Sequence, residues 1–201
     1  MANNEQRLEK QLAFLVEVDK MKTILRQTIL ADKSRQENDA EHSWHFALMA
    51  LVLWEYAGNT GLNLLRILKM ALVHDLVEVY AGDTPAFGAQ SNPGDKEARE
   101  QAAADKLFGL LPAEQGAELR ALWEEFDAME TPDSRYAAAI DRLQPFLNNS
   151  VTNGHTWRLH GATESQVLAR MDMVRQAAPA LWPFVKKTIG EAMDKGYIRE
   201  G

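Results

Sequence analysis

Apolar residues recur at spacings of three and four positions along most of this chain, and that period is typical of amphipathic helices. No long alternating run of β-branched residues predicts a strand. We therefore expect an all-α fold, a helical bundle formed by a single domain over residues 1–201. The pattern predicts helices over about residues 4–22, 39–56, 62–80, 95–111, 112–126, 132–151, 163–177 and 180–195.

Two of these segments, 39–56 and 62–80, are apolar on most faces, so we expect them to form the centre of the core. After the second of them, residues 82–94 read GDTPAFGAQSNPG, where three glycines and two prolines predict a loop. Its position makes this loop a candidate lid. Pro145 predicts a kink in the helix that contains it.

Composition narrows the class of protein. The 201 residues are 46% apolar, which supports one buried core, and the formal net charge of −7 argues against a nucleic-acid polymer as a partner. The absence of cysteine excludes thiolate catalysis and cysteine-ligated zinc. The first residues lack the apolar stretch of a signal peptide, and the longest apolar run, FALMALVLW, is about half of a membrane span. We expect a cytoplasmic protein with no membrane partner.

One ionisable pair, His74-Asp75, follows the apolar run ILKMALV in the second central segment. Burying such groups is costly unless they are paired, neutralised or bound to a metal. A hydrogen bond with no function is one explanation of the pair. Two other residues favour a metal site: His42 opens the other central helix, and Asp141 lies among Ala and Ile in AAAIDRL.

Two imidazoles and two carboxylates on three apolar helices form a mixed nitrogen and oxygen ligand set. This set suits a divalent transition metal, Mn, Fe, Co, Ni or Zn, better than Ca, and Mg is a further alternative. Four protein ligands on an octahedral ion leave positions for water and substrate, as catalysis requires.

The ordered motifs AEHSWH, HDLVEVYAGDTPAF and AAAIDRLQPFL resemble the H…HD…D signature of the HD-domain superfamily of metal-dependent phosphohydrolases. The likeness is to the 5′-deoxynucleotidase-like branch, which shares the ENxxEHS entry to the second helix and a Glu and an Asp soon after the HD pair. It covers about residues 20–150, and the helices over about 163–196 are expected to pack on this core. The resemblance implies an HD-type bundle in which His42, His74, Asp75 and Asp141 are the metal ligands.

The same resemblance places Glu78 and Asp83 at the active site, in water handling or substrate contact. For Glu78 the spacing agrees, because it lies one turn after His74 on the predicted helix, where a carboxylate can orient a metal-bound water or take its proton. Asp83 and Thr84 open the glycine-rich loop and are expected to contact the substrate. The alternatives are a surface carboxylate at a helix end for Glu78 and a turn or N-cap residue for Asp83.

Arg26 and Arg35 lie in the polar segment before His42, and the arginine fork suits the oxygens of a phosphate. The related branch carries an Arg-Trp pair about fifteen residues before the first His ligand. Here that region reads LRQT, so Arg26 fills the arginine position with a one-residue shift and the tryptophan is missing. Because that aromatic belongs to the sugar site, the resemblance does not extend to selectivity for deoxyribose. A salt-bridged surface role is the alternative for each arginine.

Two histidine segments have open alternatives. His45 follows His42 by three residues and is either a core histidine or a support for the metal ligands. The segment His155–His160 reads as a loop that either packs between helices or borders the pocket of this chain or of a dimer partner.

Together with the resemblance, these residues predict a metal-dependent phosphomonoesterase that hydrolyses nucleoside 5′-monophosphates, ribo or deoxyribo, to nucleoside and phosphate. One alternative is another HD chemistry, on cyclic nucleotides, nucleoside triphosphates or ppGpp. The other is a non-catalytic ligand-binding protein that keeps the metal as a structural staple. Members of the branch are commonly dimeric, so we expect a homodimer.

Overall fold

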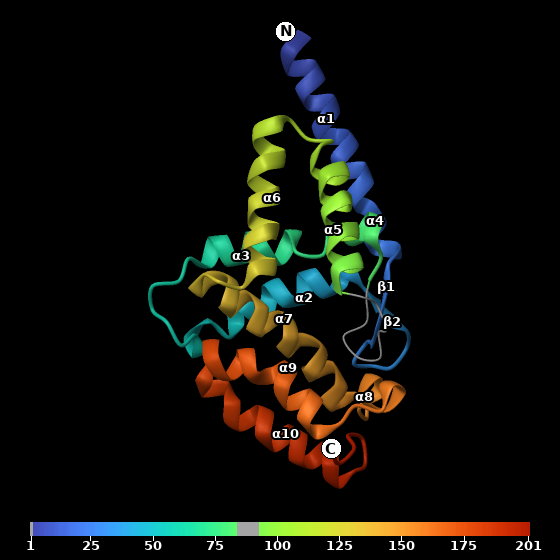
Figure 1. Ribbon diagram of the computed structural model, residues 1–201, viewed down its shortest axis with the longest axis vertical. Coiled ribbons are helices and arrows are strands. Elements are labelled where there is room, and N and C mark those ends of the chain that lie inside the picture. Colours follow the sequence, from blue (N-terminus) through green and yellow to red (C-terminus); the bar gives the residue numbers. More distant parts are fainter. Residues whose placement is uncertain (1, 84–92) are drawn as a thin grey trace.

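A computed structural model describes residues 2–83 and 93–201, and it confirms the mostly helical class that the hydrophobic pattern predicts (Figure 1). The elements in chain order are α1 (Ala2–Val18), η1 (Asp19–Thr23), β1 (Leu25–Ile29), β2 (Gln36–Asn38), α2 (Asp39–Val52), η2 (Trp54–Tyr56), α3 (Leu64–Val73), α4 (Glu78–Ala81), α5 (Pro93–Phe108), α6 (Ala113–Ala128), α7 (Pro132–Val151), α8 (His155–His160), α9 (Glu164–Ala177), η3 (Pro179–Leu181) and α10 (Trp182–Asp194). No helix within the described ranges is long and apolar enough to cross a membrane.

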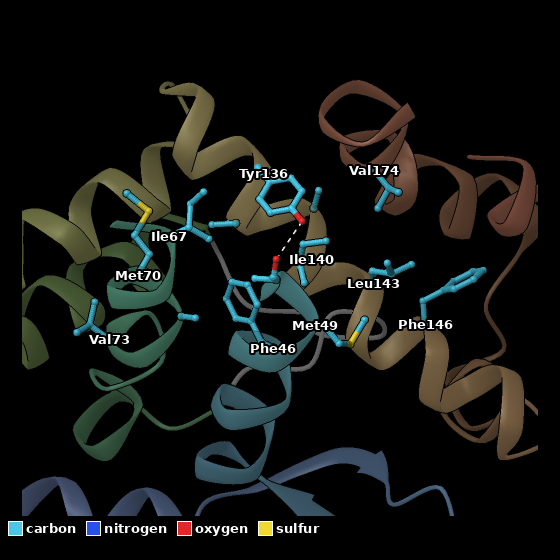
Figure 2. Packing of buried hydrophobic residues seen from close by; sticks show 14 of the residues in the cluster. Phe46, Met49, Ile67, Met70, Val73, Tyr136, Ile140, Leu143, Phe146 and Val174 are labelled. Carbon is cyan, nitrogen blue, oxygen red and sulfur yellow. Dashed lines mark hydrogen bonds between the residues drawn. The ribbon is translucent and has the colours of Figure 1, made fainter. Parts of the chain in front are cut away.

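The centre of the molecule is formed by α2, α3 and α7, which pack on one another, while α9 packs along α7. In Figure 1, α1, α5 and α6 lie at one end of the molecule and α8 to α10 at the other. Phe46, Met70 and Ile140 bring the three central helices together in the core, each fully buried (Figure 2). The Tyr136 hydroxyl lies in the same core and donates a hydrogen bond to the Ala50 carbonyl at 3.3 Å.

The start of α2 is fixed by a capping box. The Asn38 side chain accepts a hydrogen bond from the Glu41 amide at 3.0 Å, and the Glu41 carboxylate accepts one from the Asn38 amide at 3.2 Å. Both bonds satisfy amide groups that a helix N-terminus leaves unpaired. The helix therefore begins at Asp39, and His42 lies at the end of its first turn, pointing into the core.

A short antiparallel hairpin precedes α2, in the polar segment for which the sequence pattern predicts no regular element. Strand β1 pairs with β2, with Leu25 opposite Asn38. The turn between them is stabilised by Asp32, whose carboxylate accepts a hydrogen bond from the Ser34 amide at 2.9 Å, as in an Asx turn. The strands are too short and polar for their alternation to stand out in the sequence. The hairpin matters because it carries Arg26 to the functional site.

The predicted helix over residues 62–80 is divided into α3 and α4 by a turn of four residues, 74–77. In this turn the backbone hydrogen bonds join residues three positions apart, as in a 3₁₀ helix; the Glu78 amide, for example, donates to the Asp75 carbonyl at 2.9 Å. The expectation of one continuous helix over residues 62–80 is therefore wrong. From this turn, His74 reaches His42 and Asp141, while Asp75 and Glu78 reach Asp39.

Other predicted boundaries hold with smaller changes. Helix α7 begins at Pro132 with Thr131 as its N-cap and continues through Pro145; the kink stays a prediction. The segment His155–His160 forms the helix α8, so the prediction of a loop is wrong there. Its Trp157 is buried against Phe146, with ring centroids 5.3 Å apart. Of the predicted loop over 82–94, residues 84–92 lie outside the described residues.

Candidate metal centre and active site

The four predicted ligands come together from three parts of the chain. His42 belongs to α2, His74 and Asp75 to the turn after α3, and Asp141 to the middle of α7. His42 Nε2 lies 2.9 Å from Asp141 Oδ1, and His74 Nε2 lies 3.0 Å from Asp75 Oδ2. The two Nε2 atoms are 3.3 Å apart. The imidazoles are buried, while the side chains of Asp75 and Asp141 keep 14% and 18% of their surface exposed, so the cluster opens on its carboxylate side.

Hydrogen bonds on the far side of each ring fix the histidine tautomers. His74 Nδ1 lies 3.0 Å from the Ala71 carbonyl oxygen, which only accepts, so Nδ1 carries the proton. His42 Nδ1 donates to Gln144 Oε1 at 2.9 Å, because the amide nitrogen of Gln144 is turned toward Glu37 Oε1 at 2.6 Å. The Nε2 atom of each ring therefore faces the cluster. Outer hydrogen bonds of this kind are typical of metal-binding histidines.

The resulting donor set fits a divalent metal ion. Two Nε2 lone pairs and two carboxylates converge on one point, and nearby lone pairs repel one another unless a cation or a proton lies between them. The ligand atoms of His42, His74 and Asp141 all lie within 4.8 Å of one another. Mixed imidazole and carboxylate ligands suit first-row divalent metals, and Mg to a lesser degree.

The electrostatics of the cluster also favour a cation. Burial alone would lower the pKa of His74, but the neighbouring Asp75 and Asp141 raise it to about 10. Burial would raise the pKa of each of these carboxyls, yet the histidines hold both below their usual range. For His42, burial and the charge of Arg26 lower the pKa, so this ring is neutral at neutral pH. A site that holds a proton so strongly also attracts a divalent cation.

A second cluster of carboxyl groups adjoins the first and shares Asp75 with it. The ligand atoms of Asp39, Asp75 and Glu78 lie within 4.8 Å of one another. Burial, followed by the charges of Asp75, Asp39 and Asp83, raises the pKa of Glu78 to about 11. Burial and the charge of Asp75 raise the pKa of Asp39 to about 6. Glu78 is therefore a carboxyl group that keeps its proton beside the candidate metal ligands.

Arg26 connects the hairpin to both clusters. Its Nη1 donates to Asp75 Oδ2 at 2.8 Å and to Asp39 Oδ1 at 3.2 Å, and its Nε lies 4.0 Å from Glu37 Oε2. Although burial would lower the pKa of this guanidinium, the charge of Asp75 raises it. The side chain is 15% exposed, so part of it faces the opening.

The other predicted substrate-binding residues lie further out. Arg35 is exposed, and its guanidinium makes two hydrogen bonds, at 2.9 and 2.5 Å, to the Glu41 carboxylate that caps α2. The structure does not bring it to the clusters, and its contact with substrate stays a prediction. Asp83 is half-buried at the end of the first described segment. Burial raises the pKa of its carboxyl, Arg26 opposes this, and the charge of Asp75 adds to it. Thr84 lies outside the described residues.

Sequence reasoning missed several residues of the site. Glu37 and Asp39 are buried, although the segment that contains them reads as a polar connector. Gln144 is fully buried, and its spacing of three residues from Asp141 on one helix was the available signal. His45 Nδ1 lies 3.1 Å from Gln144 Nε2, so His45 contacts the residue that holds His42.

Arg170 on α9 was also missed. It lies between Val167, Met171 and Val174, the buried residues of the helix face that packs on α7, and it is itself half-buried. Burial lowers its pKa, and the charge of Asp141 acts in the opposite direction. Within the described chain no carboxylate forms an ion pair with it.

The fold and this ligand set define the class of HD-type metal-dependent phosphohydrolases. The family model described as HD domain matches residues 18–182, and the chain belongs to this family. A solved structure described as a predicted metal-dependent phosphohydrolase from Magnetospirillum magnetotacticum is 48% identical and superposes with a TM-score of 0.90 over 97% of both chains.

Curated relatives are more distant. The human 5′-deoxynucleotidase HDDC2 is 30% identical over 141 residues, which are 69% of this chain and 66% of the human protein. A 5′-deoxynucleotidase from Yersinia pestis is 31% identical over 118 residues, 56% of this chain and 59% of that protein. The resemblance to the 5′-deoxynucleotidase branch is therefore confirmed as a relationship, and the activity of those proteins enters below as a proposal.

Proposed function

We propose that the protein is a metal-dependent phosphomonoesterase that hydrolyses nucleoside 5′-monophosphates, ribo or deoxyribo, to nucleoside and phosphate. The observation that carries the proposal is the convergence of His42, His74 and Asp141, which Asp75 joins at 3.0 Å from His74 Nε2, with Glu78 in the adjoining carboxyl cluster. The relationship to proteins named 5′-deoxynucleotidases supports the choice of substrate.

The two histidines would hold the metal through Nε2, and Asp75 and Asp141 through their carboxylate oxygens. A bound divalent ion lowers the pKa of a water ligand and offsets charge on the phosphoryl group. Gln144 and the Ala71 carbonyl keep both rings in the tautomer that this requires. The His74 ring is also held by packing between Phe46 and Phe126, with ring centroids 5.2 and 5.0 Å away.

Glu78 is the proposed proton-transfer group. Its pKa is raised by burial and by neighbouring carboxylates, so Glu78 would lose its proton more readily once added positive charge offsets those carboxylates. A carboxyl whose pKa lies near the working pH is suited to orient a water and take its proton. Asp83 and Thr84 would contact the sugar or the leaving oxygen.

Two arginines are proposed to bind the phosphate. Arg26 has Nη1 fixed by Asp75 and Asp39, and its other terminal nitrogen, Nη2, would contact the phosphate. Arg170 adds a cation from α9 that has no ion pair among the described residues, in reach of the charge of Asp141. A monoester dianion needs such charge compensation, because the reaction is very slow in water.

A phosphate-release assay on the metal-loaded protein, with the nucleotide products separated by chromatography, tests this function. Ribo- and deoxyribonucleoside 5′-monophosphates should release phosphate, whereas 3′-monophosphates, triphosphates and cyclic nucleotides should react slowly. Faster hydrolysis of cyclic nucleotides, triphosphates or ppGpp would assign a different HD chemistry. Bound metal with no release from any monophosphate would contradict the proposal and favour a structural metal.

Asp75→Ala provides the matched negative variant. It should lose both bound metal and phosphate release, since Asp75 contacts both clusters. Asp172→Ala removes a carboxylate that pairs only with exposed residues on α9, and it should retain both.

A further inference from the structure

We propose that the Arg26 guanidinium stands where a second metal ion would bind, and that it thereby limits the centre to one metal ion per chain. The inference rests on the metal centre proposed above. Its test counts metal ions, so its outcome is separate from that of the nucleotidase assay.

The arrangement of carboxylates is that of a two-metal site. Asp75 belongs both to the cluster with the histidines and to the cluster with Asp39 and Glu78. A shared carboxylate between two ligand sets is what bridges paired ions, which lie about 3.5–4 Å apart in two-metal enzymes. From its ligands alone, the second cluster would be suited to a hard divalent cation.

A protein cation already lies in that cluster. Arg26 Nη1 is within hydrogen-bond distance of Asp75 at 2.8 Å and of Asp39 at 3.2 Å, so one nitrogen bridges the two carboxylates as a metal ion would. The Arg26 carbonyl also accepts a hydrogen bond from the Gln36 side chain at 2.9 Å, which ties the two strands of the hairpin together at this residue. A guanidinium does not lose its charge at any working pH, so these contacts place a positive charge in the second cluster at every working pH.

The remaining oxygens of the cluster show that it has unused capacity. Asp39 Oδ2 and Glu78 Oε2 are both buried, and among the described residues no donor other than the Glu78 carboxyl itself, which is hydrogen-bonded to Asp39, satisfies them. Asp39 is completely inaccessible to solvent. Removing the guanidinium would leave three carboxyl groups in contact and without a fixed cation, an arrangement that strongly favours binding of a divalent ion.

Excluding a second metal ion leaves Glu78 available for proton transfer. A second metal ion in this cluster would take the Glu78 carboxylate as a ligand and end its role in proton transfer. With Arg26 in place, Glu78 keeps an oxygen free beside the first metal position. Arg26 thus acts as a positioning residue that separates metal binding by His42, His74, Asp75 and Asp141 from proton transfer by Glu78.

Counting Mn²⁺ in the full-length protein at pH 8 tests this proposal. Metal-free protein is titrated with Mn²⁺ and the bound ion is measured by elemental analysis after desalting. The wild type should hold one ion per chain and Arg26→Gln two, with the exchange-coupled electron paramagnetic resonance signal of a close Mn²⁺ pair in the variant only. Arg26→Gln/Asp39→Asn should return to one ion, because a ligand of the second position is lost.

Arg66→Ala is the matched control, since it removes an arginine that pairs with Glu125 on the surface, and it should hold one ion. Two ions in the wild type, or one ion in a folded Arg26→Gln, would overturn the proposal. If circular dichroism shows that Arg26→Gln does not fold, Arg26→Lys and the wild type must each hold one ion, and two in either overturns it. One ion in the wild type without phosphate release would refute the nucleotidase function and leave this inference standing.

Discussion

Gln144 Oε1 lies 2.9 Å from His42 Nδ1, while the amide nitrogen of the same side chain lies 2.6 Å from Glu37 Oε1. One buried amide thereby fixes the tautomer of a metal-ligand candidate from the opposite side of its ring. Such outer contacts typically contribute 10–100-fold to metal affinity.

Gln144→Leu should weaken metal binding about 10–100-fold, because the His42 ring then loses the acceptor that keeps its proton on Nδ1. The measurement is the dissociation constant for Mn²⁺ or Co²⁺ by competition with a chromogenic chelator. Asn149→Ala is the control on the same helix: Asn149 is buried and accepts from the Thr156 amide at 2.9 Å. It should lower the melting temperature and leave the metal affinity unchanged. Equal affinities for Gln144→Leu and wild type would contradict this role.

Glu78→Gln should keep the metal and lose most of the catalytic rate. General acid-base groups contribute about 10²–10⁴-fold, so we expect kcat to fall at least about 100-fold with a metal content close to that of the wild type. Glu118→Gln, which neutralises an exposed carboxylate paired with Lys69, should change neither quantity. A Glu78→Gln enzyme with more than about half of the wild-type kcat would remove the assignment.

Arg170→Gln should raise KM for a nucleoside monophosphate about 10-fold or more, because hydrogen bonds to charged groups are worth about 1.5–3 kcal/mol. The metal content should be unchanged. Arg175→Gln on the same helix is the control, since Arg175 pairs with Asp172 on the exposed face. An unchanged KM, together with an unchanged affinity for inorganic phosphate as a competitive inhibitor, would exclude a phosphate contact.

Glu37 should give the folded protein a measurable dependence of stability on pH. Burial raises its pKa from 4.5 to about 7, although Arg26 and Gln144 act in the opposite direction. Between these two values the folded state binds more protons at this group than the unfolded state, so the contribution of Glu37 to stability falls as pH rises. The expected slope is about 1 kcal/mol per pH unit near pH 6.

Urea unfolding of wild type and Glu37→Gln from pH 5 to pH 8, with chelator present, measures this contribution. The difference in unfolding free energy should shift in favour of the Gln variant as pH rises and level off above about pH 8. A pH-independent difference would contradict the raised pKa. Glu41→Gln, whose exposed carboxylate has a lowered pKa because of its hydrogen bond to Arg35, should show no change in this window.

The amino-acid sequence by itself determined the class of fold and the set of residues that meet. Apolar spacing predicts α2, α3 and α7 as helices, because burial of a continuous apolar face requires the helical period. Burying an unpaired ionisable residue within an apolar run is energetically unfavourable, and this cost indicates that His42, His74, Asp75 and Asp141 form one group. The capping residues of α2 and α7 are likewise local, and Thr131-Pro132 marks the start of α7 correctly.

Only the tertiary structure decided how these groups are held and which others join them. Arg26, Asp39 and Gln144 come from a hairpin, a helix start and a helix interior, and nothing local to any one of them predicts that it faces the others. The hydrophobic period continues through residues 74–77 and predicts one helix, whereas in the structure a turn there brings His74 against Phe46 of α2 and Asp141 of α7. Hydrogen bonds and ion pairs between distant segments leave no period in the sequence, and here they bring His74 Nε2 and Arg26 Nη1 to the same oxygen of Asp75, at 3.0 and 2.8 Å.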